Sequence, residues 1–146
     1  MGVDVVTEIV IDRPVAEVGA YAADPSNAPE WYARIESVDW KTAPPLRIGS
    51  AVAFVARFLG RRLEYTYEFA EFVPGERLVM RTQQAPFPME TTYTWTALSD
   101  NFTRMTLRNR GEPSGFSRLT APFMASAVRR ANRKDLAKLK AVLEGI

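Results

Sequence analysis

The chain has 146 residues, of which 47% are hydrophobic and 25% charged, and its formal net charge at pH 7 is +2. These values are typical of a single globular domain, placed here at residues 1–146. A chain of this length buries enough surface to fold without disulfides or bound metal ions. Cysteine and histidine are both absent, which excludes disulfides, thiolate nucleophiles, Cys/His zinc sites and Ser-His-Asp triads.

The first predicted elements are a strand and two short helices. Residues Val3–Ile11 are rich in β-branched side chains and alternate in polarity, as a strand does. Pro14 ends the strand because proline lacks the N–H of a ladder, and Asp12 is a suitable N-cap for the helix behind it. The turn-forming residues 24–27 interrupt this helix, so we expect a second short helix around Trp31.

Six more strands are predicted between residues 35 and 110. They cover residues 35–42, 51–59, 62–73, 77–84, 89–98 and 102–110. Turn residues such as Pro74-Gly75 separate these alternating segments at intervals of about 8–12 residues, which is typical of an antiparallel meander. We therefore expect one antiparallel sheet and assign the chain to the α+β class.

The alternation predicts two different faces for this sheet. The apolar face collects Leu63, Tyr65, Tyr67, Phe69, Leu78, Met80, Thr82, Gln84, Met89, Thr91, Tyr93, Trp95, Met105, Leu107 and Asn109. The other face collects charged and hydroxyl side chains, which predicts ion pairs between neighbouring strands. Polar groups on the apolar face indicate a cavity, because a buried amide or hydroxyl without a partner costs about 1–3 kcal/mol. Alternatively, Thr82, Gln84 and Asn109 lie at a rim open to solvent.

Residues 114–146 have the apolar period of one long helix. Its stripe consists of Met124, Val128, Ala131, Leu139, Val142, Leu143 and Ile146. Pro122 fits the first turn after Thr120 as a cap, or else kinks a helix that begins at Phe116. Because the sheet offers the only large apolar face, we predict that it grips this helix and that a pocket lies between the two.

Two polar residues, Asn132 and Asp135, interrupt the apolar stripe. An unpaired buried carboxylate is costly. Asp135 is therefore either an acid, base or ligand anchor in the pocket, or a side chain at the edge that pairs with Lys138 or a loop amide. We favour the second reading.

The rest of the closing helix is basic. Residues 116–146 carry seven basic and two acidic side chains, a net charge of +5. This face can attract nucleic acid or anionic membrane, but a solvated helix surface is the simpler interpretation. No apolar run approaches the ~20 residues that cross a bilayer, and residues 1–4 do not resemble a secretion signal. We therefore expect a cytoplasmic protein, with peripheral membrane contact and a homodimer left open.

Several segments resemble the polyketide cyclase/dehydrase and lipid-transport superfamily (SRPBCC, START-like). They are residues 11–18 (IDRPVAEV), 23–25 (ADP), 29–31 (PEW) and the closing helix from residue 129 to residue 144. The resemblance implies the helix-grip fold, a seven-stranded antiparallel sheet curved around a long C-terminal helix with two short helices after the first strand. Where members of this group use a histidine in the cavity, this chain departs from them.

We predict that the chain binds a small hydrophobic molecule, such as a lipid, polyketide-like or isoprenoid compound, without a cofactor or a metal ion. The predicted ligand-binding residues are Tyr65, Tyr67, Met80, Thr82, Tyr93, Trp95, Met105, Asn109, Met124, Val128 and Asn132. The alternative is a cofactor-independent cyclase or dehydratase in the same cavity, for which Tyr65, Tyr67 and Asp135 are the candidates for proton transfer. Trp31 is predicted to fill the core rather than to gate the pocket.

Overall fold

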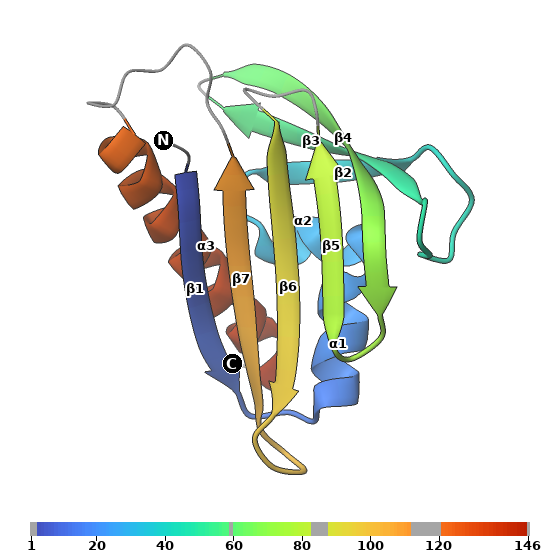
Figure 1. Ribbon diagram of the computed structural model, residues 1–146, viewed down its shortest axis with the longest axis vertical. Helices are drawn as coiled ribbons and strands as arrows, with labels where there is room; N and C mark the ends of the chain where they lie inside the picture. Colours follow the sequence, from blue (N-terminus) through green and yellow to red (C-terminus); the bar gives the residue numbers. More distant parts are fainter. Residues whose placement is uncertain (1–2, 59, 83–87, 112–120, 146) are drawn as a thin grey trace.

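The computed structural model describes residues 3–58, 60–82, 88–111 and 121–145 (Figure 1). It contains one seven-stranded antiparallel sheet with the strand order β1-β7-β6-β5-β4-β3-β2. The strands are β1 (Val3–Ile11), β2 (Ile35–Trp40), β3 (Ala51–Phe58), β4 (Arg61–Val73), β5 (Arg77–Thr82), β6 (Met89–Ala97) and β7 (Thr103–Gly111). The predicted strands are confirmed, and their predicted ends differ from these by at most two residues.

Three α-helices and a short 3-10 helix accompany the sheet. They are α1 (Val15–Ala23), the 3-10 helix η1 (Pro25–Asn27), α2 (Ala28–Trp31) and α3 (Ala121–Glu144). All of them lie on one side of the sheet (Figure 1). The first three connect β1 and β2, which form opposite edges of the sheet, so this connection has to cross the sheet's inner face.

Two predictions about helix ends need correction. Pro14, and not Asp12, is the N-cap of α1, and no side chain caps this helix. The backbone N–H of Asp12 instead donates to Glu144 Oε2 at 2.8 Å, which ties the end of β1 to the end of α3. The described part of the closing helix begins at Ala121 with Pro122 in its first turn, whereas Phe116 and Thr120 lie outside the described residues.

Helix α3 packs chiefly against β1 and α2 (Figure 1). Leu136 and Leu139 are buried, and Nζ of Lys140 donates to the carbonyl oxygen of Val10. Near the other end of the helix, Phe123 is 78% exposed. The C-terminal half of α3 is therefore its anchored half. None of the described helices is both long enough and apolar enough to span a membrane.

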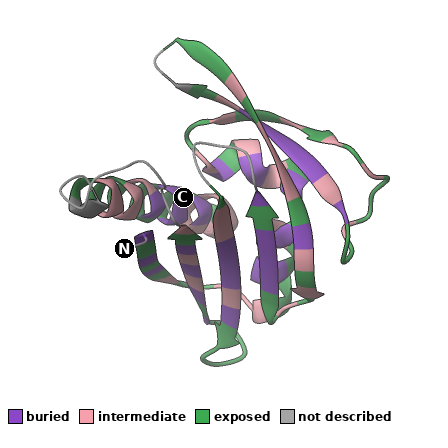
Figure 2. Ribbon diagram, turned by 45° about the horizontal axis from the view of Figure 1, so that its top comes forward, coloured by how far each residue is buried: buried purple, intermediate pink, exposed green. Residues whose placement is uncertain are grey.

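The inner face of the sheet carries the core (Figure 2). Trp31, Phe69, Leu78, Met105 and Leu107 are at most 2% exposed, and they form one cluster with Leu136 and Leu139 of α3. The prediction that Trp31 fills the core is confirmed. Thr92, a hydroxyl residue predicted for the outer face of the sheet, is also buried. Its cross-strand neighbours are Val79 and Arg108, and the long side chain of Arg108 can cover it.

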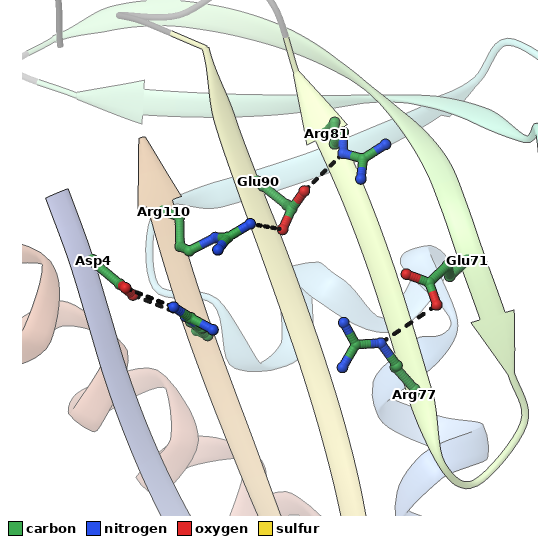
Figure 3. Close-up of polar contacts among 7 residues, drawn as sticks. Asp4, Glu71, Arg77, Arg81, Glu90 and Arg110 are labelled. Atoms are coloured by element: carbon green, nitrogen blue, oxygen red, sulfur yellow. Dashed lines mark hydrogen bonds and ion pairs between the residues drawn. The ribbon is translucent and has the colours of Figure 1, made fainter. Parts of the chain in front are cut away.

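Cross-strand ion pairs cover the outer face (Figure 3), as the alternation predicted. Glu90 on β6 accepts from Arg81 on β5 at 2.7 Å and from Arg110 on β7 at 3.0 Å. On the edge strand, Asp4 accepts two hydrogen bonds from Arg108. The bond from Arg81 holds the pKa of the Glu90 carboxyl below its ordinary value, against partial desolvation. Each charged residue drawn in Figure 3 therefore has a partner on a neighbouring strand.

Candidate functional site

A pocket of about 480 Å³ lies under the inner face of the sheet. Its wall comes from β2 to β7, from the residues just after α2 and from α3. The lining residues are Tyr32, Arg34, Ile35, Phe54, Ala56, Leu63, Tyr65, Tyr67, Met80, Thr91, Asn109 and Asn132. Ligand pockets in proteins have this size, and their walls are likewise mostly apolar and aromatic with a few polar groups.

Burial of the lining residues separates a closed end of the pocket from a mouth. Thr91, Asn109 and Asn132 are between 5% and 7% exposed and form the polar part of the closed end. Arg34 is exposed and Leu63 is half-buried, so these two mark the mouth. The wall therefore changes from a charged rim, through an apolar middle, to a neutral polar floor.

At the closed end, polar side chains of β4, β6 and β7 contact one another. The hydroxyl of Thr91 on β6 donates to Oδ1 of Asn109 on β7 at 2.9 Å. Tyr67 on β4 also interacts with Thr91, and this contact lowers the pKa of the Tyr67 hydroxyl. Burial is the larger effect and raises that pKa to about 12, so the hydroxyl stays protonated at neutral pH.

A second polar pair joins the helical connection between β1 and β2 (residues 12–34, called the elbow below) to the sheet. The hydroxyl groups of Tyr32, which caps the end of α2, and Tyr93 on β6 are hydrogen bonded to each other. Burial raises the pKa of both well above the ordinary range of tyrosine. The ring of Trp31 packs against both rings, with centroids 4.1 Å from Tyr32 and 5.9 Å from Tyr93. Within this aromatic group, Tyr32 lines the pocket, and Trp31 and Tyr93 belong to the core.

Asn132 is the contribution of α3 to the pocket wall. It is 6% exposed, and its Nδ2 has no hydrogen-bond partner among the described residues. The amide nitrogen of a buried asparagine normally donates to a protein group or a water. Asn132 thus carries an unused donor in the wall of the pocket, and neighbouring atoms cover its Nδ2.

Asp135, one turn further along α3, has a structural partner. Its Oδ1 accepts from the backbone N–H of Ala33 at 3.1 Å, and the residue is 8% exposed. Burial raises the pKa of this carboxyl above its ordinary value, although the bond from Ala33 and the charge of Arg34 act in the opposite direction. The contact is the pairing with a loop amide that we favoured, but Asp135 is buried and does not lie at an edge. It is not among the described residues that line the pocket.

The structure divides the predicted ligand-binding residues into two groups. Those that lie on the pocket wall are Tyr65, Tyr67, Met80, Asn109 and Asn132. Those that are not among the described lining residues are Thr82, Tyr93, Trp95, Met105, Met124 and Val128. Tyr93, Trp95 and Met105 share the predicted face but are at most 4% exposed within the core. Met124 and Val128 are half-buried on the first half of α3.

Seven lining residues were not predicted as ligand contacts, and five of them come from segments early in the chain. They are Tyr32, Arg34, Ile35, Phe54, Ala56, Leu63 and Thr91. Leu63 and Thr91 belong to the predicted apolar face and could have been included on that ground. Phe54 and Ala56 share one face of β3 and alternate with the charged Arg57, which is exposed. This alternation could have placed both residues on the inner wall.

The basic face of α3 lies apart from this pocket. Arg129, Arg130, Arg133 and Lys134 line a separate shallow hollow with Ser126. In the part of the chain that the structure describes, no ion pair is formed by these four side chains. The same part of the chain holds no group of three acidic side chains that could bind a metal ion.

Comparisons with known proteins bear on the family and on the fold. The family described as "Polyketide cyclase / dehydrase and lipid transport" matches residues 2–144. No curated protein matches the chain. The solved structure of the di-domain aromatase/cyclase BexL, from the BE-7585A biosynthetic pathway, is 21% identical with a TM-score of 0.81. The match covers 97% of this chain and 46% of BexL, so the chain spans about half of that protein's length.

Two further structures match over nearly their whole length. The Zhui aromatase/cyclase from Streptomyces sp. R1128 is 16% identical with a TM-score of 0.81, and the match covers 99% of this chain and 94% of that chain. A START superfamily protein from Mycobacterium smegmatis is 11% identical with a TM-score of 0.81, covering 97% of each chain. At these identities the likeness concerns the fold, and it confirms the predicted helix-grip architecture.

Proposed function

Because this chain belongs to the polyketide cyclase/dehydrase and lipid-transport family, we propose that it binds a small, mostly apolar molecule in the pocket under its sheet. The observation that carries this proposal is the pocket itself, about 480 Å³ with an apolar and aromatic middle and a neutral polar floor. A lipid, polyketide-like or isoprenoid compound has the matching distribution of apolar surface and few polar groups.

The apolar part of the wall can supply enough free energy for binding. Phe54 and Tyr67 pack edge to face at 5.5 Å, and Leu63 on β4 and Met80 on β5 extend the apolar surface. Burying ~300 Å² of apolar ligand surface at ~25 cal/mol/Å² gives about 8 kcal/mol before the costs of association. Affinity in the micromolar range therefore needs only a few well-placed polar contacts.

Titration with the neutral fluorescent probe N-phenyl-1-naphthylamine tests this proposal. Ala56 lines the pocket, so Ala56→Trp places an indole in the space that the probe would occupy. Ala97→Trp is the matched control, because Ala97 is exposed at the end of β6. We expect saturable binding by the wild type and by Ala97→Trp, and at least tenfold weaker binding by Ala56→Trp. Binding that is equal in all three proteins would contradict the proposal, as would its absence from the wild type.

Catalysis in the same pocket is the second candidate function. The observation that favours it is the pair of wall hydroxyls on β4, Tyr65 and Tyr67, whose pKa values are both raised by burial. Both groups stay protonated at neutral pH, so they can donate to a developing oxyanion of a carbonyl substrate. The proposed cyclase or dehydratase would use them without a cofactor.

Single turnover of a poly-β-keto thioester by purified protein tests the catalytic alternative. We expect Tyr67→Phe to lower its rate by about 100-fold, the usual contribution of one positioned proton donor, while binding of N-phenyl-1-naphthylamine stays within about threefold. Tyr21→Phe is the control, because Tyr21 bonds Glu30 on the elbow and is not among the lining residues. Equal rates with wild type, Tyr67→Phe and no protein would leave binding as the function.

A further inference from the structure

We propose that Asn132 selects the ligand, by donating from Nδ2 to an uncharged oxygen acceptor, a ketone or similar carbonyl, at the closed end of the pocket. This inference rests on the proposed binding function and names the chemical class that the pocket accepts. It assigns a specificity-determining role to a single residue of α3.

The first observation is the unsatisfied amide. Asn132 is 6% exposed, lines the pocket, and has no partner for Nδ2 among the described residues. It occupies a position in the apolar stripe of α3 between Val128 and Leu136. An aliphatic side chain would pack there without leaving a hydrogen-bond donor unpaired. Neighbouring atoms cover Nδ2 almost completely. A buried donor without a partner is costly, so a turn of the side-chain amide that brings Nδ2 to a ligand acceptor is favourable.

The second observation is how Asn132 differs from other polar groups in the interior. Among the described residues, two other buried side-chain nitrogens lack partners, the indole Nε1 atoms of Trp31 and Trp95, but neither residue is part of the described pocket lining. Asn109, on the opposite wall, already has its Oδ1 occupied by Thr91. Among the described lining residues, Asn132 is thus the one whose buried side-chain nitrogen lacks a partner.

The third observation limits the charge of the acceptor. Asp135 lies one turn from Asn132 on α3 and is itself buried, with its carboxylate directed to the N–H of Ala33. The groups at the closed end, Thr91, Asn109 and Asn132, are all neutral. A ligand carboxylate would lose its hydration there without a cation to replace it. A carbonyl oxygen needs only the one donor that Asn132 offers.

A matched pair of rigid probes, 9-fluorenone and fluorene, tests this inference, because the two differ by a carbonyl in place of a methylene. Their affinities are measured by displacement of N-phenyl-1-naphthylamine from the wild type, Asn132→Leu and Asn132→Asp. We expect the ratio of the two dissociation constants to favour fluorenone in the wild type and to fall about fivefold to tenfold in both variants, as the loss of one buried hydrogen bond implies.

Asn132→Leu also tests whether the change is specific. Leucine fills a similar volume, so fluorene should bind at least as tightly as to the wild type, and the unfolding temperature should not fall. Asn101→Leu, in the exposed turn after β6, is the control and should keep the wild-type ratio.

The outcomes separate this inference from the function on which it rests. If both probes bind but the ratio is the same in the wild type, Asn132→Leu and Asn132→Asp, the inference is wrong and the binding function stands. If neither probe nor N-phenyl-1-naphthylamine binds the wild type, the proposed function itself has failed.

Discussion

The inner face of the sheet is filled at one end and hollow at the other, although the same strands run through both. On β6 and β7, Trp95 lies opposite Met105 at the filled end, and Thr91 lies opposite Asn109 at the hollow end. Helix α1 covers the filled end, where an added Cβ at Gly19 would lie 3.7 Å from the Trp95 ring. At the hollow end polar side chains line a pocket. Polar residues in an otherwise apolar alternation thus mark the hollow end of the sheet, where α3 contributes Asn132 to the wall.

The largest difference in stability should appear when one leucine is shortened to alanine at the filled end and another at the hollow end. Leu78 is fully buried opposite Tyr93, whereas Leu63 is a half-buried residue of the pocket wall. We expect Leu78→Ala to lower the free energy of unfolding by about 2–4 kcal/mol and Leu63→Ala by less than about 1 kcal/mol. Probe affinity should fall only for Leu63→Ala. Urea unfolding and titration with N-phenyl-1-naphthylamine measure the two effects, and equal losses of stability would remove the distinction between the ends.

A smaller loss of stability is expected when the close contact between α1 and the β4–β5 turn, at the filled end, is disturbed. A Cβ at Gly19 would lie 2.9 Å from the Cα of Gly75 in the β4–β5 turn, closer than packed atoms come. Alanine should favour a helix over glycine by up to about 1 kcal/mol, but the clash should outweigh this gain. We expect Gly19→Ala to destabilise the protein by about 1–3 kcal/mol. A more stable variant in urea unfolding would show that α1 is not tightly docked at this end.

The outer face should respond to pH in the manner of exposed ion pairs. Because the pKa of Glu90 is lowered, its pairs with Arg81 and Arg110 contribute stability above the ordinary pKa of glutamate, and this contribution is lost as the pH falls. We expect Glu90→Gln to cost about 0.5–1 kcal/mol at pH 7, and less in high salt. Urea unfolding between pH 3 and pH 7 measures this, and a cost that does not change with pH would contradict it.

Asp135, on the inner side of the sheet, should change the stability with pH in the opposite direction to Glu90. Burial raises its folded-state pKa, so the wild type loses stability as the pH rises from the ordinary value of 3.8 through the raised value. Asp135→Asn keeps an oxygen that can accept from Ala33 and removes the titration. We therefore expect the stability of the variant relative to the wild type to increase with pH in this range. A difference that is flat from pH 3 to pH 7 would show that the carboxyl is not desolvated.

The sequence by itself determined the strands, their two faces and the amphipathic helix. These follow from local rules, since side chains alternate along a strand and repeat every 3.6 residues in a helix. The polarity of single positions also carried information, because Asn109 and Asn132 were predicted as ligand contacts and both line the pocket.

Only the tertiary structure decided which part of the apolar face is hollow. Trp95 and Met105 have the same alternation as Tyr65 and Tyr67, yet the first two are enclosed in the core and the last two line the pocket. Tyr32 joined the wall because the elbow after β1 brings it against Tyr93, 61 residues away in the chain. The physical reason is that alternation depends on neighbours along the chain, whereas a cavity depends on where distant elements dock.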